Sequence, residues 1–169
     1  ISTDHPAFEE TEKAVADRIN RLMNIRGKQT VESFHKRLGK IMWDKCGMAR
    51  NAEGLKNAIT EIQQLKKEFW SDVRIPGEIN EMNPELDKAG RVADFIELGE
   101  LMCIDALNRN ESCGGHFREE SQTPEGEADR KDQEFAYVAA WEFKGDHQWE
   151  MHKEELTFDV AKPSQRSYK

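Results

Sequence analysis

The sequence predicts a mainly α fold, an antiparallel bundle of three to four helices followed by a C-terminal loop and a small antiparallel β-ribbon. Two observations predict it. Apolar residues recur three and four positions apart from residue 6 to residue 107, as on one face of a helix. After residue 134, apolar and polar residues alternate, as in half-exposed strands. We expect a helical bundle domain over residues 1–117, and a tail over residues 118–169 that packs on the bundle or on a missing domain.

The first helix is predicted to begin around Pro6, with Thr3 or Asp4 as its N-cap, and to stop at Gly27. Helical spacing places one apolar face along it, made of Phe8, Val15, Ile19, Leu22 and Met23. A helix joined to its neighbours by short loops must cover such a face, so we expect it to be buried.

The second and third helices have clearer beginnings. Thr30 opens the second, which ends near Cys46-Gly47, and Asn51 caps the third. The expected apolar face of the second helix contains Val31, Phe34, Leu38, Ile41 and Met42. That of the third contains Leu55, Ala58, Ile59, Ile62, Leu65 and Phe69.

The fourth helix has the strongest start signal in the chain. After the loop Ile75-Pro76-Gly77, the run Asn83-Pro84-Glu85 offers a capping side chain, a proline in the first turn and an acid near the positive end of the helix dipole. Its apolar face is predicted to contain Leu86, Ala89, Val92, Ala93, Ile96, Met102, Cys103 and Leu107.

The tail is predicted to be a polar loop over residues 118–134 and then a ribbon, with a turn at Lys144-Gly145-Asp146. The residues expected to alternate along its strands are Phe135, Tyr137, Ala139, Trp141 and Phe143, then Trp149 and Met151, then Leu156, Phe158 and Val160. The four tryptophans are expected in the core or at an interface, and they are Trp43, Trp70, Trp141 and Trp149.

Composition excludes several classes of protein. The net charge of −8 argues against a general nucleic-acid binder, and no run reaches the 18 or so apolar residues of a membrane span. Cys46, Cys103 and Cys113 form no CxxC pair, which favours reduced thiols over a disulfide framework or zinc ribbon. The chain begins at Ile1 and shows no signal peptide, which suggests a trimmed or excised piece of a longer protein.

Possible metal ligands are few. Glu32-Ser33-Phe34-His35 matches the ExxH spacing of di-iron bundles, but such sites need a second ExxH motif that the chain lacks. His147 and His152 are five residues apart, so they do not share a strand face. We expect no catalytic, cofactor-binding or metal-binding residue in this segment. A metal-dependent bundle enzyme using Glu32 and His35 remains an alternative.

The run NESCGGHFREE over residues 110–120 holds the most specific pattern. Gly114 and Gly115 can adopt positive φ at the exit of the fourth helix. His116 and Arg118 add a titratable ring and a fixed cation. Cys113 beside His116 could form a thiolate pair, but the C-terminal end of a helix disfavours an anion, so a structural cysteine is expected. The pattern indicates a sharply turned polar junction where something docks.

This run resembles the ESRGAHxR motif in the C-terminal region of succinate dehydrogenase and fumarate reductase flavoprotein subunits, and is closer to the bacterial branch that reads SCGGHFR. Cys113 and Gly115 stand where many members have arginine and alanine. Three further segments resemble the family in the same order: residues 42–51 (MWDKCGMARN), the cluster at residues 129–132 and the ending Lys162-Pro163-Ser164-Gln165-Arg166-Ser167-Tyr168.

The resemblance implies a parent flavoprotein with FAD in an N-terminal domain of the same chain, interconverting succinate and fumarate. Its implied partners are an iron–sulfur subunit and a membrane anchor, with a cytoplasmic location on the inner face of the membrane. The fragment itself would bind no FAD and would support the FAD domain. The expected domain-interface residues are Cys113, Gly114, Gly115, His116 and Arg118. A free-standing helical interaction module remains the main alternative.

Overall fold

The computed structural model describes residues 2–164, which form five α-helices and two small two-stranded sheets. The predicted class, mainly helical with a small ribbon, is confirmed. The chain divides into two compact units, Ile1–Lys40 with Ile62–Gly99, and Ile41–Glu61 with Glu100–Lys169. The division falls within α2 (Val31–Cys46), α3 (Ala52–Asp72) and α4 (Pro84–Asn108). The ending predicted at residues 165–168 lies outside the described residues.

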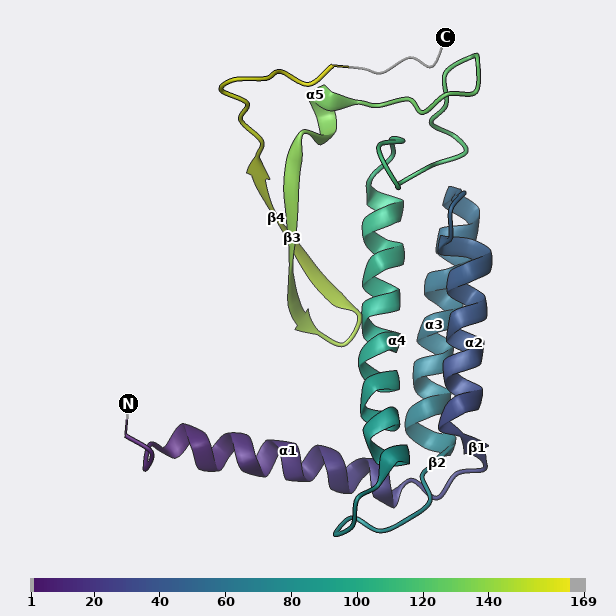
Figure 1. Ribbon diagram of the computed structural model, residues 1–169. Helices are drawn as coiled ribbons and strands as arrows, with labels where there is room; N and C mark the ends of the chain where they lie inside the picture. Colours follow the sequence, from purple (N-terminus) through teal and green to yellow (C-terminus); the bar gives the residue numbers. More distant parts are fainter. Residues whose placement is uncertain (1, 165–169) are drawn as a thin grey trace. The chain divides into compact units, whose positions relative to one another are not determined.

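Helices α2, α3 and α4 of the first unit run side by side (Figure 1). The apolar faces that the periodicity predicts for them form its core. Phe34 of α2 and Phe69 of α3 are fully buried and meet edge to face, with ring centroids 5.3 Å apart. Around them lie the buried side chains of Val31, Leu38, Ile62, Leu65, Val92 and Ile96. Such burial supplies most of the driving force for packing helices together.

The predicted starts of three helices are confirmed by capping hydrogen bonds. The Thr30 hydroxyl accepts the Ser33 N–H at 3.2 Å at the start of α2. The Asn51 side chain accepts the Gly54 N–H at 2.7 Å before α3. At α4, the Asn83 side chain accepts the Leu86 N–H at 3.0 Å and Pro84 is the first helical residue. Each bond satisfies a backbone N–H that has no partner within the helix.

Gly27 has a different role from the predicted one. Helix α1 (Pro6–Asn24) already ends at Asn24, with Ile25 in extended conformation as its C-cap. Beyond it, β1 (Gln29–Thr30) pairs in parallel with β2 (Val73–Arg74). A Cβ on Gly27 would lie only 1.9 Å from the Asp72 carbonyl oxygen. Glycine is therefore needed here so that two backbones can approach closely, and not as a helix stop.

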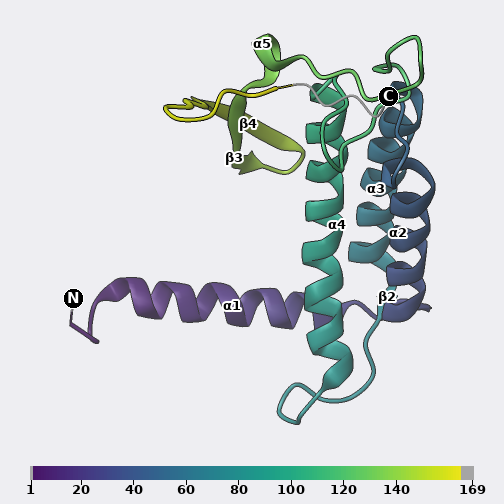
Figure 2. The same cartoon turned by 45° about the horizontal axis from the view of Figure 1, so that its top comes forward.

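Helix α1 departs from the prediction in two ways. Its N-cap is His5, whose Nδ1 accepts the Ala7 N–H, instead of Thr3 or Asp4. Phe8 and Val15 are 56% and 53% exposed, because only the C-terminal part of α1 packs on the other helices of its unit, where Leu22 is buried. The N-terminal part extends away from those helices in both views (Figures 1 and 2).

The second unit contains the predicted ribbon. Strand β3 (Tyr137–Gly145) pairs antiparallel with β4 (Gln148–Glu155), and Asp146 and His147 form the turn. Phe143 and Trp149 face each other across the strands, with ring centroids 5.2 Å apart. The predicted ribbon is confirmed, but its turn is displaced, because Lys144 and Gly145 of the predicted turn still belong to β3.

Two contacts with the last turns of α4 hold this ribbon in place. The Trp141 indole N–H donates to Asp105 at 2.7 Å. His147 Nδ1 lies 2.8 and 2.9 Å from the two carboxylate oxygens of Glu100, which is 1% exposed. A two-stranded hairpin is only marginally stable alone, so these anchors matter for its formation.

Some details of the tail and the tryptophans were predicted wrongly. Phe135 belongs to the short helix α5 (Asp132–Phe135), which also ends the predicted loop early. Strand β4 ends at Glu155, and the apolar residues after it are exposed instead of alternating in a strand; these are Leu156, Phe158 and Val160. Trp43 is 84% exposed and therefore does not lie in the core. The alternative predicted for it, an interface, stays a prediction. Among residues 2–164, no helix combines the length and apolarity needed to cross a membrane.

Candidate functional site

The residues that follow α4 form a tight polar junction, defined here as residues 109–121. At its tip, the Cys113 N–H donates to the His116 carbonyl at 2.8 Å and the His116 N–H donates to the Cys113 carbonyl at 3.1 Å. Gly114, with φ of +58°, turns the chain at this point. Gly115 is also exposed but does not have positive φ, so only Gly114 uses the conformation that the sequence allows to both glycines.

Arg118 lies inside the junction and caps the end of α4. Its side chain is 3% exposed, and its Nη1 donates to the Ala106 carbonyl at 2.8 Å and the Leu107 carbonyl at 3.2 Å. Its Nε donates to Glu120 at 3.2 Å. The last carbonyls of a helix have no partner within it and carry partial negative charge, so a guanidinium placed there satisfies and neutralises them together.

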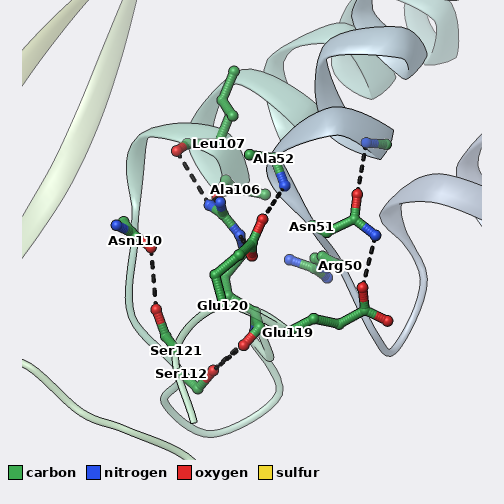
Figure 3. Close-up of polar contacts among 12 residues, drawn as sticks. Arg50, Asn51, Ala52, Ala106, Leu107, Asn110, Ser112, Glu119, Glu120 and Ser121 are labelled. Atoms are coloured by element: carbon green, nitrogen blue, oxygen red, sulfur yellow. Dashed lines mark hydrogen bonds and ion pairs between the residues drawn. The ribbon is translucent and has the colours of Figure 1, made fainter.

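Two buried serines, Ser112 and Ser121, hold the loop that carries Arg118, and Figure 3 draws a hydrogen bond of each. The Ser112 hydroxyl accepts the Arg118 N–H at 2.8 Å and donates to the Arg118 carbonyl at 3.1 Å. The Ser121 hydroxyl donates to the Asn110 side-chain oxygen at 3.1 Å. Buried polar groups of this kind stabilise a loop only when each finds a partner, as these do.

The same junction binds the loop between α2 and α3. The Arg50 N–H donates to the Phe117 carbonyl at 3.1 Å, and the Glu119 N–H donates to the Arg50 carbonyl at 2.8 Å. Figure 3 shows Asn51 and Ala52 facing the carboxylates of Glu119 and Glu120, to which they donate. These bonds join segments 68 residues apart in the sequence.

His116 is held between two of these segments. Its Nδ1 lies 3.0 Å from Arg50 Nη1, and its Nε2 lies 2.7 Å from the Arg109 carbonyl oxygen. A guanidinium can only donate, so Nδ1 must accept and Nε2 must carry the proton, which defines the neutral tautomer. Burial lowers the pKa of His116, and the charges of Arg50, Arg118 and Arg109 lower it further, although the bond to the Arg109 carbonyl acts in the opposite direction.

A third segment closes the junction from the C-terminal side. Glu111 is 1% exposed and accepts from Arg109 at 2.7 Å and from the Lys131 N–H at 2.9 Å. The Ser112 N–H donates to the Asp129 carbonyl at 2.9 Å. The 129–132 cluster, which the sequence placed only by resemblance, therefore lies against the junction.

All five predicted interface residues come together in this turn, but they do different things. Gly114 and Gly115 are exposed at the tip, Cys113 and His116 are half-buried, and Arg118 is buried. Sequence reasoning missed Arg50 and Glu111. Arg50 contacts His116, 66 residues away, and Glu111 accepts from Arg109 nearby and from the Lys131 N–H 20 residues away. The only signal for Arg50 was its place in the resembling segment 42–51.

The other titratable residues that the sequence singled out form ion pairs, hydrogen bonds or ring contacts outside the junction. Glu32 pairs with Lys36 at 2.7 Å, and the His35 ring packs on Phe95 with centroids 5.9 Å apart. His152 bonds to Glu142 at 2.8 Å, and with Glu150 they form an exposed group whose ligand atoms lie within 4.8 Å of one another. Lys144 pairs with both glutamates of that group, at 2.7 and 3.1 Å.

The junction thus joins three segments through paired arginines, carboxylates and backbone groups. Its cations contact carboxylates, a ring nitrogen or carbonyls of the same chain. Such an arrangement can hold a surface turn in one position, and its exposed residues include the two glycines of the tip.

Comparison with known proteins gives a consistent result. The model of the family described as fumarate reductase flavoprotein C-term matches residues 35–168. An uncharacterised FAD-dependent oxidoreductase of Methanocaldococcus jannaschii is 28% identical over 111 residues, covering 66% of this chain and 20% of the relative. The fumarate reductase flavoprotein subunit of Helicobacter pylori is 29% identical over 106 residues, covering 63% of this chain and 15% of the relative.

The fold has also been seen before. A structure of quinol fumarate reductase from E. coli superimposes with a TM-score of 0.77 at 21% identity, covering 98% of this chain and 27% of the other. At that identity the likeness concerns the fold alone. The chain spans about a fifth or less of the length of the curated relatives.

Proposed function

We propose, because this chain belongs to the fumarate reductase flavoprotein C-terminal family, that its parent protein holds FAD and interconverts succinate and fumarate. The match of the family model over residues 35–168 carries the proposal. It also favours a domain of a larger flavoprotein over a free-standing interaction module. Function lives in sites and not in folds, and the reacting groups are proposed to lie in the rest of the parent chain.

The role proposed for this domain is structural support of the FAD domain. In the parent, we place an iron–sulfur subunit as the electron partner and a membrane anchor as the quinone-handling subunit. The complex would lie on the inner face of the cell membrane without a span from this domain. The resemblance to the family supports these assignments.

A direct test is the activity of the protein that contains this chain. The purified parent should reduce fumarate with a reduced viologen dye as electron donor, and the 169-residue chain alone should not. Fumarate reduction by the chain alone would overturn the proposal. So would a purified parent protein that does not reduce fumarate.

Within this domain, the interface with the FAD domain is proposed to include the tip of the junction. A Cβ on Gly115 would meet no described atom of this chain within 4 Å, and its φ is not positive. The chain itself therefore does not require glycine at this position. Close approach of another surface would explain it.

Substitution of the two tip glycines separates the conformational role of Gly114 from the proposed interface role of Gly115. Gly114→Ala should destabilise the domain by about 1 kcal/mol, because a side chain resists positive φ. Gly115→Ala should leave the melting temperature of the domain unchanged but weaken its association with the FAD domain. If Gly115→Ala assembles as well as the wild type, the tip is not at the interface.

A further inference from the structure

Two arginines are paired across the backbone where the chain leaves α1 and returns as β2. Arg26 pairs with Arg74 in an isolated antiparallel bridge, and the neighbouring Gly27 N–H donates to the Val73 carbonyl at 3.2 Å. Residues that lie directly opposite each other in such a pair have Cβ atoms about 4.5–5.5 Å apart and side chains on the same side. The two arginine side chains therefore leave the backbone next to each other, and both residues are exposed.

Neither of these two arginines has a counter-charge within the chain. Among residues 2–164, neither side chain makes an ion pair, a hydrogen bond or a ring contact. The other arginines in that range all contact a carboxylate, an aromatic ring, a ring nitrogen or a carbonyl, and they are Arg18, Arg21, Arg37, Arg50, Arg91, Arg109, Arg118 and Arg130. Carboxylates are not scarce, since the net charge of the chain is −8. Like charges that face each other across paired backbones are destabilising, so an anion bound between the two would relieve their repulsion.

The two arginines line one hollow within the first unit. The hollow has a volume of about 580 Å³, and Asn20, Asn24 and Ile75 also line it. Its size falls within the range of about 300–1,000 Å³ that is typical of small-molecule sites. The two asparagine amides make no hydrogen bond with other residues of the range 2–164, so both can donate to a ligand. Glu78 lines the hollow too, but its carboxylate pairs with neither arginine.

The loop that forms part of this hollow is held in place by Asn83. The Asn83 side-chain amide donates to the Pro76 carbonyl at 2.9 Å and to the Glu78 carbonyl at 3.4 Å. Gly77, between these two residues, has φ of +91°, and a Cβ there would lie 2.8 Å from the Asn83 Nδ2. Because the loop is already fixed, binding of a ligand costs less conformational entropy than it would in a loose loop.

The arrangement of donors selects the kind of anion. One guanidinium fork can satisfy both oxygens of a carboxylate by itself. A phosphate group offers three or more acceptor oxygens and carries close to two negative charges. Two adjacent guanidinium groups therefore match a phosphate group in charge and in number of acceptors better than they match a single carboxylate.

We propose that Arg26 and Arg74, with the side-chain amides of Asn20 and Asn24, bind one phosphate group, supplied by inorganic phosphate or by a small phosphate monoester. The bound group neutralises the facing arginines and so stabilises the contact between the end of α1 and β2. The site shares no residue with the junction, and it does not depend on the proposed succinate and fumarate chemistry.

Isothermal titration calorimetry of the 169-residue chain with inorganic phosphate, at low ionic strength and about pH 8, tests the site. One equivalent should bind to the wild type. Arg26→Gln and Arg74→Gln should each weaken binding by at least about tenfold, since each removes hydrogen bonds to a charged group. Arg91→Gln is the matched control, because it removes the same charge from an exposed residue that does not line the hollow. It should bind phosphate like the wild type.

Glycerol phosphate, used in place of inorganic phosphate, distinguishes the two sources. Tighter binding of the ester supports a phosphate monoester as the ligand, and equal or weaker binding supports free phosphate. Acetate should bind at least about tenfold more weakly than either, because it has a single charge and two oxygens.

The stability of the variants shows that a loss of binding is not a loss of the fold. Without phosphate, Arg26→Gln should melt at or above the temperature of the wild type, because it removes the repulsion between like charges. With phosphate, only the wild type and Arg91→Gln should gain melting temperature. A wild type that binds no phosphate would overturn the proposal. Equal phosphate binding by the wild type and Arg26→Gln, or acetate binding as tight as that of phosphate, would do the same.

Discussion

Arg118 and His116 show how single residues hold the junction together. Arg118 contacts two carbonyls at the end of α4 and the Glu120 carboxylate while being almost fully buried. His116 bridges Arg50 and the Arg109 carbonyl. Arg118 satisfies carbonyls 11 and 12 residues away, and His116 joins Arg109 to Arg50, which is 66 residues away. Loss of either side chain leaves polar partners unpaired.

Arg118→Ala should therefore destabilise the domain by about 3 kcal/mol, because it leaves the Ala106 and Leu107 carbonyls without the donor that Arg118 supplies. Urea denaturation measures the change. Arg91→Ala is the control, since Arg91 makes an exposed i,i+4 pair with Asp87 and should change stability by less than about 0.5 kcal/mol. Similar losses for the two variants would contradict the account.

His116 should make stability depend on pH. Its pKa in the folded domain is below the ordinary value of 6.5, so the unfolded chain binds the proton more readily. The contribution of His116 is fully present above pH 6.5 and is lost as the pH falls toward its folded pKa. The stability difference between wild type and His116→Gln should shrink from pH 8 to pH 5 in urea titrations. A constant difference would count against the neutral tautomer.

At the scale of elements, the close approach of Gly27 to Asp72 allows β1 to pair with β2. Because a Cβ would meet the Asp72 backbone at 1.9 Å, Gly27→Ala should displace the β1–β2 pairing and cost about 1–3 kcal/mol or more. Gly39→Ala is a matched control on the exposed side of α2, where nothing lies within 4 Å of the added Cβ. It should stabilise the helix by about 0.5–1 kcal/mol. Melting temperatures that move in the same direction would contradict this.

The anchoring of the ribbon on α4 gives a second prediction at this scale. Trp141→Phe keeps an aromatic ring but removes the 2.7 Å bond to Asp105. Hydrogen exchange of the β3 and β4 amides should become faster, by about tenfold for a loss of about 1.4 kcal/mol. Unchanged protection of these amides would show that the indole bond does not hold the ribbon.

The sequence predicted best the elements that are determined by contacts between residues close together in the chain. The caps at Thr30, Asn51 and Asn83 were predicted correctly because each cap bonds a backbone N–H three residues away. The exposure of Phe8 could not be predicted, since the periodicity of a helix does not tell what covers its apolar face. The contact between Arg50 and His116 spans 66 residues and has no local pattern. The five junction residues were singled out by their own residue pattern and then by the family's motif, but their separate roles required the structure.

For the whole molecule, we propose a domain of a larger protein whose reacting groups lie elsewhere in the parent chain. Its most specific sequence, the junction, is joined within the chain by hydrogen bonds and ion pairs and exposes a glycine tip. The family match, and relatives of which the matched segment covers only 20% and 15%, agree with the C-terminal domain of a larger flavoprotein. We therefore expect flavin to be bound by the parent and not by this chain.

The flavin content of the two proteins tests this claim most directly. Visible absorbance near 450 nm, measured per mole of purified protein in the same way for both, should show about one flavin in the parent protein and none in the 169-residue chain. Near-stoichiometric flavin in the chain alone would contradict the account, as would a parent protein without flavin.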